Sequence, residues 1–192
     1  MANQGLIKAG GFLILSMFIF SCGEIAFPRP RGFPRVELPA SHEYKTYSRD
    51  ACPFSFEYPA NGLPERELAD SCVLDIRFPG HNYKWHITYR RIGDGKPRRV
   101  HEEEYRELVM KHISHLDKLV EEPLQTPQGW GILFEMIGTL GAPAQVIFGD
   151  SSHLLMASFY FDRAVSQDSL KPLVDWVKED LRHMVQTVKF LE

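Results

Sequence analysis

Six stretches of the chain alternate apolar and polar residues, or are apolar almost throughout, as β-strands do. In the first three, every second side chain can face a core. The last three are separated by loops that contain glycine, proline or Asp-Ser-Ser, and the final stretch is apolar at nearly every position, which is typical of a central strand. The predicted strands are 54–58, 74–78, 85–90, 129–138, 144–149 and 153–162.

Two other segments place apolar residues three or four positions apart, the spacing of one face of an α-helix. The first predicted helix covers 101–122 and ends at Pro123, because proline cannot continue a helix. The second begins at a cap on Asp168 or Ser169, and its apolar stripe continues to Val188.

The resulting order is three strands, a helix, three strands and a helix, all within one domain at 51–192. Strands joined by short loops pair antiparallel, and the helices cover the sheet to bury their apolar faces. The sequence therefore predicts an α+β fold with an antiparallel sheet of about six strands covered by two long helices. This order resembles the α/β/α sandwich of the Mog1/PsbP-like superfamily, a scaffold used mainly for binding.

Residues 1–21 have the features of a secretory signal peptide, since Lys8 precedes an apolar run too short to span a membrane. The run ends in IFSC at 19–22, which resembles the bacterial lipobox. We expect cleavage between Ser21 and Cys22 and fatty acyl chains such as palmitate on Cys22, which would anchor the chain permanently. The alternative is a plain signal peptide cut elsewhere, with Cys22 an incidental thiol.

Residues 22–50 follow as a predicted lipidated tether rich in proline and arginine. The proline-rich part of it, from Cys22 to Pro39, favours extended polyproline II, and these 18 residues would hold the folded body up to roughly 55 Å from the anchor. An acidic run after the lipidated cysteine resembles the surface-export signal of some Bacteroidota lipoproteins, but only Glu24 is acidic here, which favours the periplasmic side. The tether contains Pro28, Arg29, Pro30, Arg31, Pro34, Arg35 and Pro39.

The composition is that of an ordinary globular protein. The chain has 192 residues, of which 44% are hydrophobic and 12% aromatic, which argues against disorder and suits one domain with a core. The formal net charge of −3 gives no basis for nucleic-acid binding.

Cys52, before the first strand, and Cys72, before the second, are candidates for a disulfide in an exported domain. The starts of neighbouring strands can meet at the Cα spacing that a disulfide needs. A disulfide that closes the loop between Cys52 and Cys72 would contribute roughly 3 kcal/mol to the free energy of unfolding. The alternative is two separately buried thiols.

The strongest catalytic-looking pattern imitates a GDSL-type esterase. The sequence GDSS ends at Ser152, and DLRH runs from Asp180 to His183, mimicking the nucleophile and Asp-x-x-His blocks of those enzymes. In the esterases the serine follows the first strand of a parallel sheet, whereas Ser151 lies late in the chain between two strands. Asp180 and His183 lie inside a predicted helix. We therefore expect no catalytic residue.

Neither a metal site nor a cofactor site has a basis in the sequence. The histidines are dispersed, and there is no Cys-x-x-Cys pair, His-Glu-x-x-His pair, phosphate loop or dinucleotide fingerprint. A packed His112 beside a solvated His115 is favoured over a shared metal. The run from Glu102 to Glu104 is expected in the first helical turn, where carboxylates oppose the dipole. A small basic cluster, suited to an acidic protein partner or to none, comprises Arg90, Arg91, Arg98 and Arg99.

Short blocks in a single order resemble the gliding-motility lipoprotein GldD family of Bacteroidota. The string PRGFPRVELP at 30–39 looks like that family's PKGYxRIxLP opening, and CPFSFEYP at 52–59 is similar to its CPFxFxYP block. The blocks span essentially the whole mature chain, and the departures from the family pattern cluster towards 150–168. The remaining blocks are Cys72 with 75–79, 87–89, His112, 149–153, 159–161 and 168–172.

The resemblance implies a cell-envelope lipoprotein that supports gliding and the type IX secretion apparatus, as an assembly factor without enzymatic activity. It also implies a location on a membrane, and the stretch just after Cys22, in which only Glu24 is acidic, favours the side that faces the periplasm. The implied partners are the membrane, through the lipid anchor, and other envelope lipoproteins of that system, such as GldJ and GldK.

Two other interpretations remain open. The chain could be a periplasmic ligand- or glycan-binding module, which a deep apolar pocket with convergent polar groups would favour. The third interpretation is the esterase, which requires the Ser151 Oγ atom within hydrogen-bond distance of a histidine.

Overall fold

The computed structural model describes residues 37–38, 41–68, 72–93, 95–111, 116–163 and 165–191. The predicted signal peptide, Cys22 and the tether before Glu37 lie outside these residues, as do His112 and His115.

A large antiparallel sheet forms the centre of the domain. Its strand order is β10-β7-β8-β9-β5-β4-β3, and β6 pairs with β7 beside β10. The strands are β3 (Leu63–Leu68), β4 (Val73–Phe78), β5 (Tyr83–Arg91), β6 (Leu116–Thr126), β7 (Gly129–Leu140), β8 (Ala144–Gly149), β9 (His153–Phe161) and β10 (Val165–Ser166).

A second, three-stranded antiparallel sheet has the order β1-β2-β11. It is built from β1 (Tyr44–Arg49), β2 (Cys52–Pro59) and the short C-terminal β11 (Lys189–Phe190). Strand β1 lies at the end of the segment predicted as tether, so the folded body includes that end.

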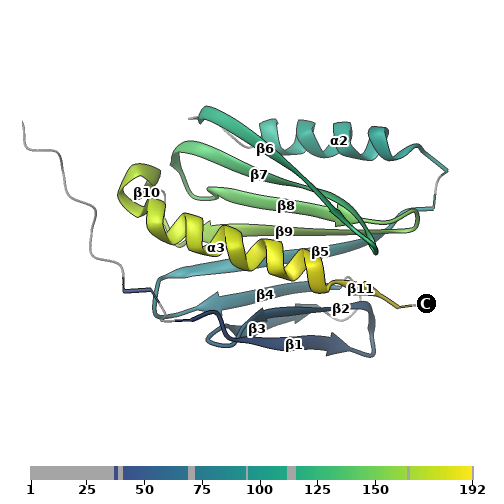
Figure 1. Ribbon diagram of the computed structural model, residues 1–192, viewed down its shortest axis with the longest axis horizontal. Coiled ribbons are helices and arrows are strands. Elements are labelled where there is room, and N and C mark those ends of the chain that lie inside the picture. The colour runs from purple at the N-terminus through teal and green to yellow at the C-terminus, as the bar shows by residue number, and fades with distance from the viewer. Residues whose placement is uncertain are drawn as a thin grey trace, which may run out of the picture. The chain divides into compact units, whose positions relative to one another are not determined.

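The two helices cover opposite faces of the large sheet. Helix α3 (Gln167–Thr187) packs with the small sheet over one face, and Figure 1 shows it running roughly along the strands. Helix α2 (Arg98–Lys111) covers part of the other face, where Tyr105 and Val109 pack against β7, β8 and β9. The larger core, on the α3 side, contains Phe54, Phe56, Trp85, Phe148 and Phe159, each almost fully buried.

The α+β class, the antiparallel pairing and the two covering helices agree with the prediction, but the extent of the sheets does not. All six predicted strands are present, as β2, β4, β5, β7, β8 and β9. The prediction missed the second sheet and strands β1, β3, β6, β10 and β11.

The predicted helix 101–122 is wrong in its second half. The helix starts earlier, at Arg98, and ends at Lys111, and residues from Leu116 onward form β6. Strand β6 pairs only with β7, and Pro123 is tolerated there because an edge strand has positions whose N–H needs no partner. The three- and four-residue spacing of its apolar residues imitated a helix.

The second predicted helix corresponds to α3. Its backbone is non-helical at Leu170, so the regular part begins there and Pro172 falls in its first turn, where the missing N–H costs nothing. The side chains of the predicted caps, Asp168 and Ser169, lie outside the described part of the structure.

Candidate functional site

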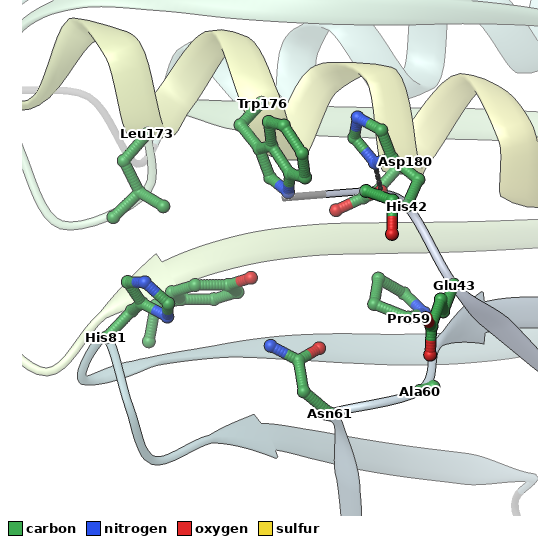
Figure 2. Close-up of a pocket in the computed structure, with 11 residues that line it drawn as sticks. His42, Glu43, Pro59, Ala60, Asn61, His81, Leu173, Trp176 and Asp180 are labelled. Carbon is green, nitrogen blue, oxygen red and sulfur yellow. Dashed lines mark hydrogen bonds and ion pairs between the residues drawn. The ribbon is translucent and has the colours of Figure 1, made fainter. Parts of the chain in front are cut away.

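A pocket of about 300 Å³ opens beside α3 on the side of the small sheet. Its walls come from the segment that leads into β1, from the β2–β3 and β4–β5 connections and from α3. Figure 2 shows Leu173, Trp176 and Asp180 on one side of the central space and His81 and Asn61 on the other. The remaining lining residues are Ser41, His42, Glu43, Pro59, Ala60 and Tyr83.

Two periodicities bring the pocket's side chains together. Trp176 and Asp180 are four apart on α3 and therefore share one helix face. His42 and Tyr44 are two apart at the start of β1, so both side chains point to the same side of an extended chain. The described contacts join these two pairs across the gap between strand and helix.

Asp180 is the most deeply buried polar group of the pocket, with only 1% of its side chain exposed. Its Oδ1 atom accepts hydrogen bonds from His42 Nδ1 at 2.6 Å and from the Tyr44 hydroxyl at 2.9 Å. The Oδ2 atom is buried and has no hydrogen-bond partner in the described structure. Burial raises the pKa of the Asp180 carboxyl, and the bonds from His42 and Tyr44 only partly oppose this shift.

Aromatic stacking fixes the same segment on the helix. The His42 ring stacks on Trp176 with centroids 3.7 Å apart, and Tyr44 stacks on His183 at 3.6 Å. His183 Nε2 in turn lies 2.7 Å from a carboxylate oxygen of Glu57 on β2. The positions of His42 and Trp176 at the pocket are therefore held from several sides.

The electrostatic character of the pocket is acidic. Glu43 and Asp180 contribute carboxylates, and none of the described residues that line the pocket is a lysine or arginine. Burial raises the pKa of the Tyr83 hydroxyl, and the nearby charge of Asp180 adds to the shift. An anionic ligand would meet repulsion here, whereas a neutral or cationic group would not.

Comparison with known families identifies the chain. Residues 23–190 match the family model described as gliding motility lipoprotein GldD. The chain belongs to this family. Membership associates it with gliding motility and with the cell envelope. No curated protein sequence matches the chain. No helix in the described part of this GldD family member is long and apolar enough to cross a membrane.

Two solved structures are similar to the described domain. The yeast (Saccharomyces cerevisiae) Ran-binding protein Mog1p is similar with a TM-score of 0.53 and 10% identity, over 79% of this chain and 97% of that one. Cyanobacterial PsbP from Synechocystis is similar with a TM-score of 0.47 and 11% identity, over 82% and 98% of the two chains. At such low identity the Mog1p likeness supports the fold class of this GldD family member alone.

The esterase-like blocks of this GldD family member do not assemble into a triad in the described structure. Asp180 bonds His42 and Tyr44, and His183 bonds Glu57, so the two are not paired with each other. Ser151 is exposed in the β8–β9 turn, and the side chain that accepts the hydrogen bonds described for that turn is Asp150.

Asp150 is a structural turn residue. Its Oδ1 atom accepts hydrogen bonds from the backbone N–H of Ser152 and of His153, at 2.7 and 2.8 Å. The His153 ring lies 2.9 Å from Oδ2. Burial opposes ionisation of Asp150, but the bonds from His153 and the two amides outweigh it and lower the pKa.

Cys52 and Cys72, at the starts of β2 and β4, form a disulfide in the structure, with Cα atoms 5.6 Å apart. The two thiols are thus joined and not separately buried. The bridge connects the small sheet to the large one.

The other residues that the sequence suggested as site candidates form no site in the described structure. Among the described residues no group of three His, Cys, Asp or Glu side chains could hold a metal ion. The expectation that Glu102–Glu104 occupy the first turn of their helix is wrong, because α2 begins at Arg98. Glu104 instead bonds Lys96 at 2.8 Å, and Glu103 lies 3.4 Å from Arg99 of the predicted basic cluster.

The sequence did not reveal the pocket. In the sequence Asp180 stands out only as part of the esterase-like pattern, and nothing marks His42 or Trp176 as a site residue. The available signal was weak: an Asp beside the apolar stripe of an amphipathic helix, four residues after a Trp, and a His-x-Tyr pair before a strand.

Proposed function

We propose that this GldD family member is a lipid-anchored, periplasm-facing lipoprotein that supports gliding motility and type IX protein secretion as a non-catalytic assembly or stability factor. The observation that carries the proposal is the family match over 23–190, which begins directly after Cys22 of the lipobox-like sequence.

The chemistry of the described domain is consistent with a docking role. The residues that imitate an esterase are engaged in a turn and in contacts between α3 and the small sheet. The large sheet, covered on both faces, supplies a rigid body whose surface can support another protein. The acyl chains on Cys22 would fix this body at a membrane face, and the tether would set its reach.

The anchor is tested by replacing Cys22 with Ala. We expect the wild-type chain to incorporate radiolabelled palmitate and to sediment with membranes, and the Cys22→Ala chain to do neither. Equal membrane association of both chains would contradict the anchor.

The cellular role is tested with a strain that lacks the chain. We expect loss of gliding and of type IX cargo secretion, restored by the wild-type gene, together with lower amounts of GldJ or GldK if the chain stabilises them. Normal secretion in the deletion strain would refute the proposal. Retention of GldJ and GldK in a secretion-defective strain would refute the stabilising role alone.

A ligand-binding role is a second candidate because the domain has a pocket with convergent polar groups beside Trp176. Its volume of about 300 Å³ lies at the lower end of known ligand sites. Equilibrium dialysis against envelope glycans tests whether the ligand is a glycan. We expect the protein to retain no neutral glycan, since the carboxylates of the pocket favour a positively charged group.

A further inference from the structure

The buried carboxylate of Asp180 is incompletely satisfied. One of its oxygens accepts two hydrogen bonds, whereas Oδ2 is shielded from solvent and accepts none from the described residues. A buried polar atom without a partner costs about 1 to 3 kcal/mol, and more when it is charged. Native proteins seldom retain such a cost unless a ligand or partner offsets it.

The position of Asp180 makes a ligand the natural source of that compensation. Asp180 lines the pocket, and Figure 2 shows it among residues that surround the central space. A donor group that enters beside Trp176 would approach this carboxylate. The exposed Glu43 at the same pocket adds a second carboxylate that attracts the same kind of group.

The charges of the pocket select a cation. Its lining within the described part of the chain has two carboxylates and no lysine or arginine, so phosphate or carboxylate ligands would be repelled. A neutral sugar would be tolerated but would leave the carboxylates without a countercharge. The ligand that compensates both groups carries a positive charge and several N–H donors.

The aromatic walls select a planar cation among these. Trp176, Tyr83 and two histidines line the pocket, and Trp176 is only partly buried. A guanidinium is planar and weakly hydrated and stacks on aromatic faces, whereas an ammonium is a strongly hydrated point charge. Arginine is also a frequent anchor residue in protein interfaces, where it fills such pockets.

We propose that this pocket receives the guanidinium group of an arginine side chain presented by a partner protein of the cell envelope. The inference rests on the docking role proposed above and gives that role a location. The guanidinium donates to Asp180 Oδ2, lies against the aromatic wall and has Glu43 as its second countercharge.

Binding to the purified full-length chain in detergent tests the chemistry directly. The probe is the capped tripeptide Gly-Arg-Gly, followed by the NMR shift of the Trp176 indole N–H. The matched control is the same peptide with citrulline, which has the shape of arginine without its charge. We expect at least tenfold tighter binding of the arginine peptide, and weaker binding of a lysine peptide. Equal binding of the arginine and citrulline peptides would overturn the proposal.

Variants connect this binding to the pocket. Asp180→Asn should weaken it about tenfold and Glu43→Gln about threefold, the latter being an exposed position that leaves the fold intact. The control Asp75→Asn changes another buried carboxylate, which lies on β4 and is bonded to His86 on β5, and should leave affinity unchanged. The assignment of binding to this pocket would be overturned if Asp75→Asn lowered the affinity as much as the pocket variants do. It would also be overturned if neither Asp180→Asn nor Glu43→Gln lowered the affinity.

A crosslink identifies the source of the arginine. A photoreactive residue in place of the exposed Asn61 should form an adduct with an arginine-containing segment of another envelope protein. An adduct within residues 22–36 of the same chain would overturn the claim that the arginine comes from a partner protein. Tighter peptide binding after Arg29, Arg31 and Arg35 are changed to Gln would overturn it too, because it would mean that these arginines compete for the pocket. If the peptide binds as expected but the deletion strain secretes normally, the proposed function fails while the pocket assignment stands.

Discussion

Two Asp–His pairs in this chain use the same residue types with opposite results. Asp150 and His153 lie three residues apart in the β8–β9 turn, whereas Asp180 meets His42 across 138 positions of sequence. Both oxygens of Asp150 have partners and its pKa is lowered, but one oxygen of Asp180 has none and its pKa is raised.

The difference follows from the backbone around each carboxylate. In a turn, amide N–H groups are free to bond a side chain, so Asp150 is satisfied by the backbone N–H groups of Ser152 and His153. In the middle of a helix every N–H is already bonded to the preceding turn, so Asp180 depends on side chains from elsewhere. The satisfied pair builds structure, and the unsatisfied pair leaves capacity for a ligand.

The largest effect should come from the disulfide that connects the small sheet, which carries Tyr44 and Glu57, to the large sheet. Replacing Cys52 and Cys72 by Ala should lower the free energy of unfolding in urea by about 3 kcal/mol, because the bond closes a loop of moderate length. Hydrogen exchange should rise in β1 and β2 more than in the β8–β9 turn. Cys22→Ala is the matched control and should leave unfolding unchanged. Equal loosening of both regions would contradict their separation.

Gly149, directly before Asp150, offers a way to disrupt the β8–β9 turn that contains the Asp150–His153 pair. A Cβ at this position would lie 2.3 Å from the carbonyl oxygen of His153, a backbone atom that cannot move away alone. We expect Gly149→Ala to cost about 2 to 3 kcal/mol in urea unfolding. Gly80→Ala, where a Cβ meets nothing within 4 Å, is the control and should be nearly neutral. Similar losses for both variants would show that this close approach does not hold the turn.

Removing the Asp150 carboxylate should have a smaller effect of about 2 kcal/mol, since two backbone amides and the His153 ring lose their acceptor. Asp150→Asn should recover part of this loss, because the amide oxygen still accepts from the backbone. Thermal unfolding of the two variants measures the difference. If the Asp150→Ala chain were as stable as the wild type, the Asp150 carboxylate would not stabilise the turn.

The strands and the second helix could be predicted because their periodicities are local. Strand β7 and its neighbours alternate or are apolar throughout, and α3 keeps its stripe from Leu173 to Val188. Strand β6 could not be predicted, since its apolar residues fit a helix as well as a one-sided edge strand. Strand β3, LPEREL, is rich in charges and lies at a sheet edge, so no buried face marks it.

The candidate site was harder to predict than the fold, because its contacts are distant in sequence. The GDSS and DLRH blocks suggest an esterase site because each is contiguous in sequence. In the structure, however, Asp180 pairs with His42 and not with His183. Nothing in a single sequence links position 42 to position 180. The Asp150 turn, in contrast, was readable as turn chemistry because its partners follow within three residues.

The smallest effect, and the one that separates the two carboxylates most directly, is the sign of their pH dependence. The pKa of Asp180 is raised in the folded chain, so the folded state binds its proton more tightly than the unfolded state does. Its contribution to the free energy of unfolding therefore falls as the pH rises from the usual aspartate value through the raised pKa. The pKa of Asp150 is lowered, so its contribution is present above the usual value and is lost as the pH falls through the lowered pKa.

Urea unfolding from about pH 3 to about pH 7 measures both signs by comparing each Asp→Asn variant with the wild type. Asp180→Asn should gain stability relative to the wild type as the pH rises, by no more than about 1 kcal/mol, because its neighbours His42 and Tyr44 keep an acceptor. Asp150→Asn should lose stability relative to the wild type over the same change. Glu57 and Glu179, which lie near Tyr44, and His42 and His183, which lie near Asp180, are present in both chains, so each comparison changes one carboxyl group only. Differences of the same sign for the two variants would mean that the unpartnered oxygen of Asp180 is satisfied in solution, and the contrast between the two pairs would disappear.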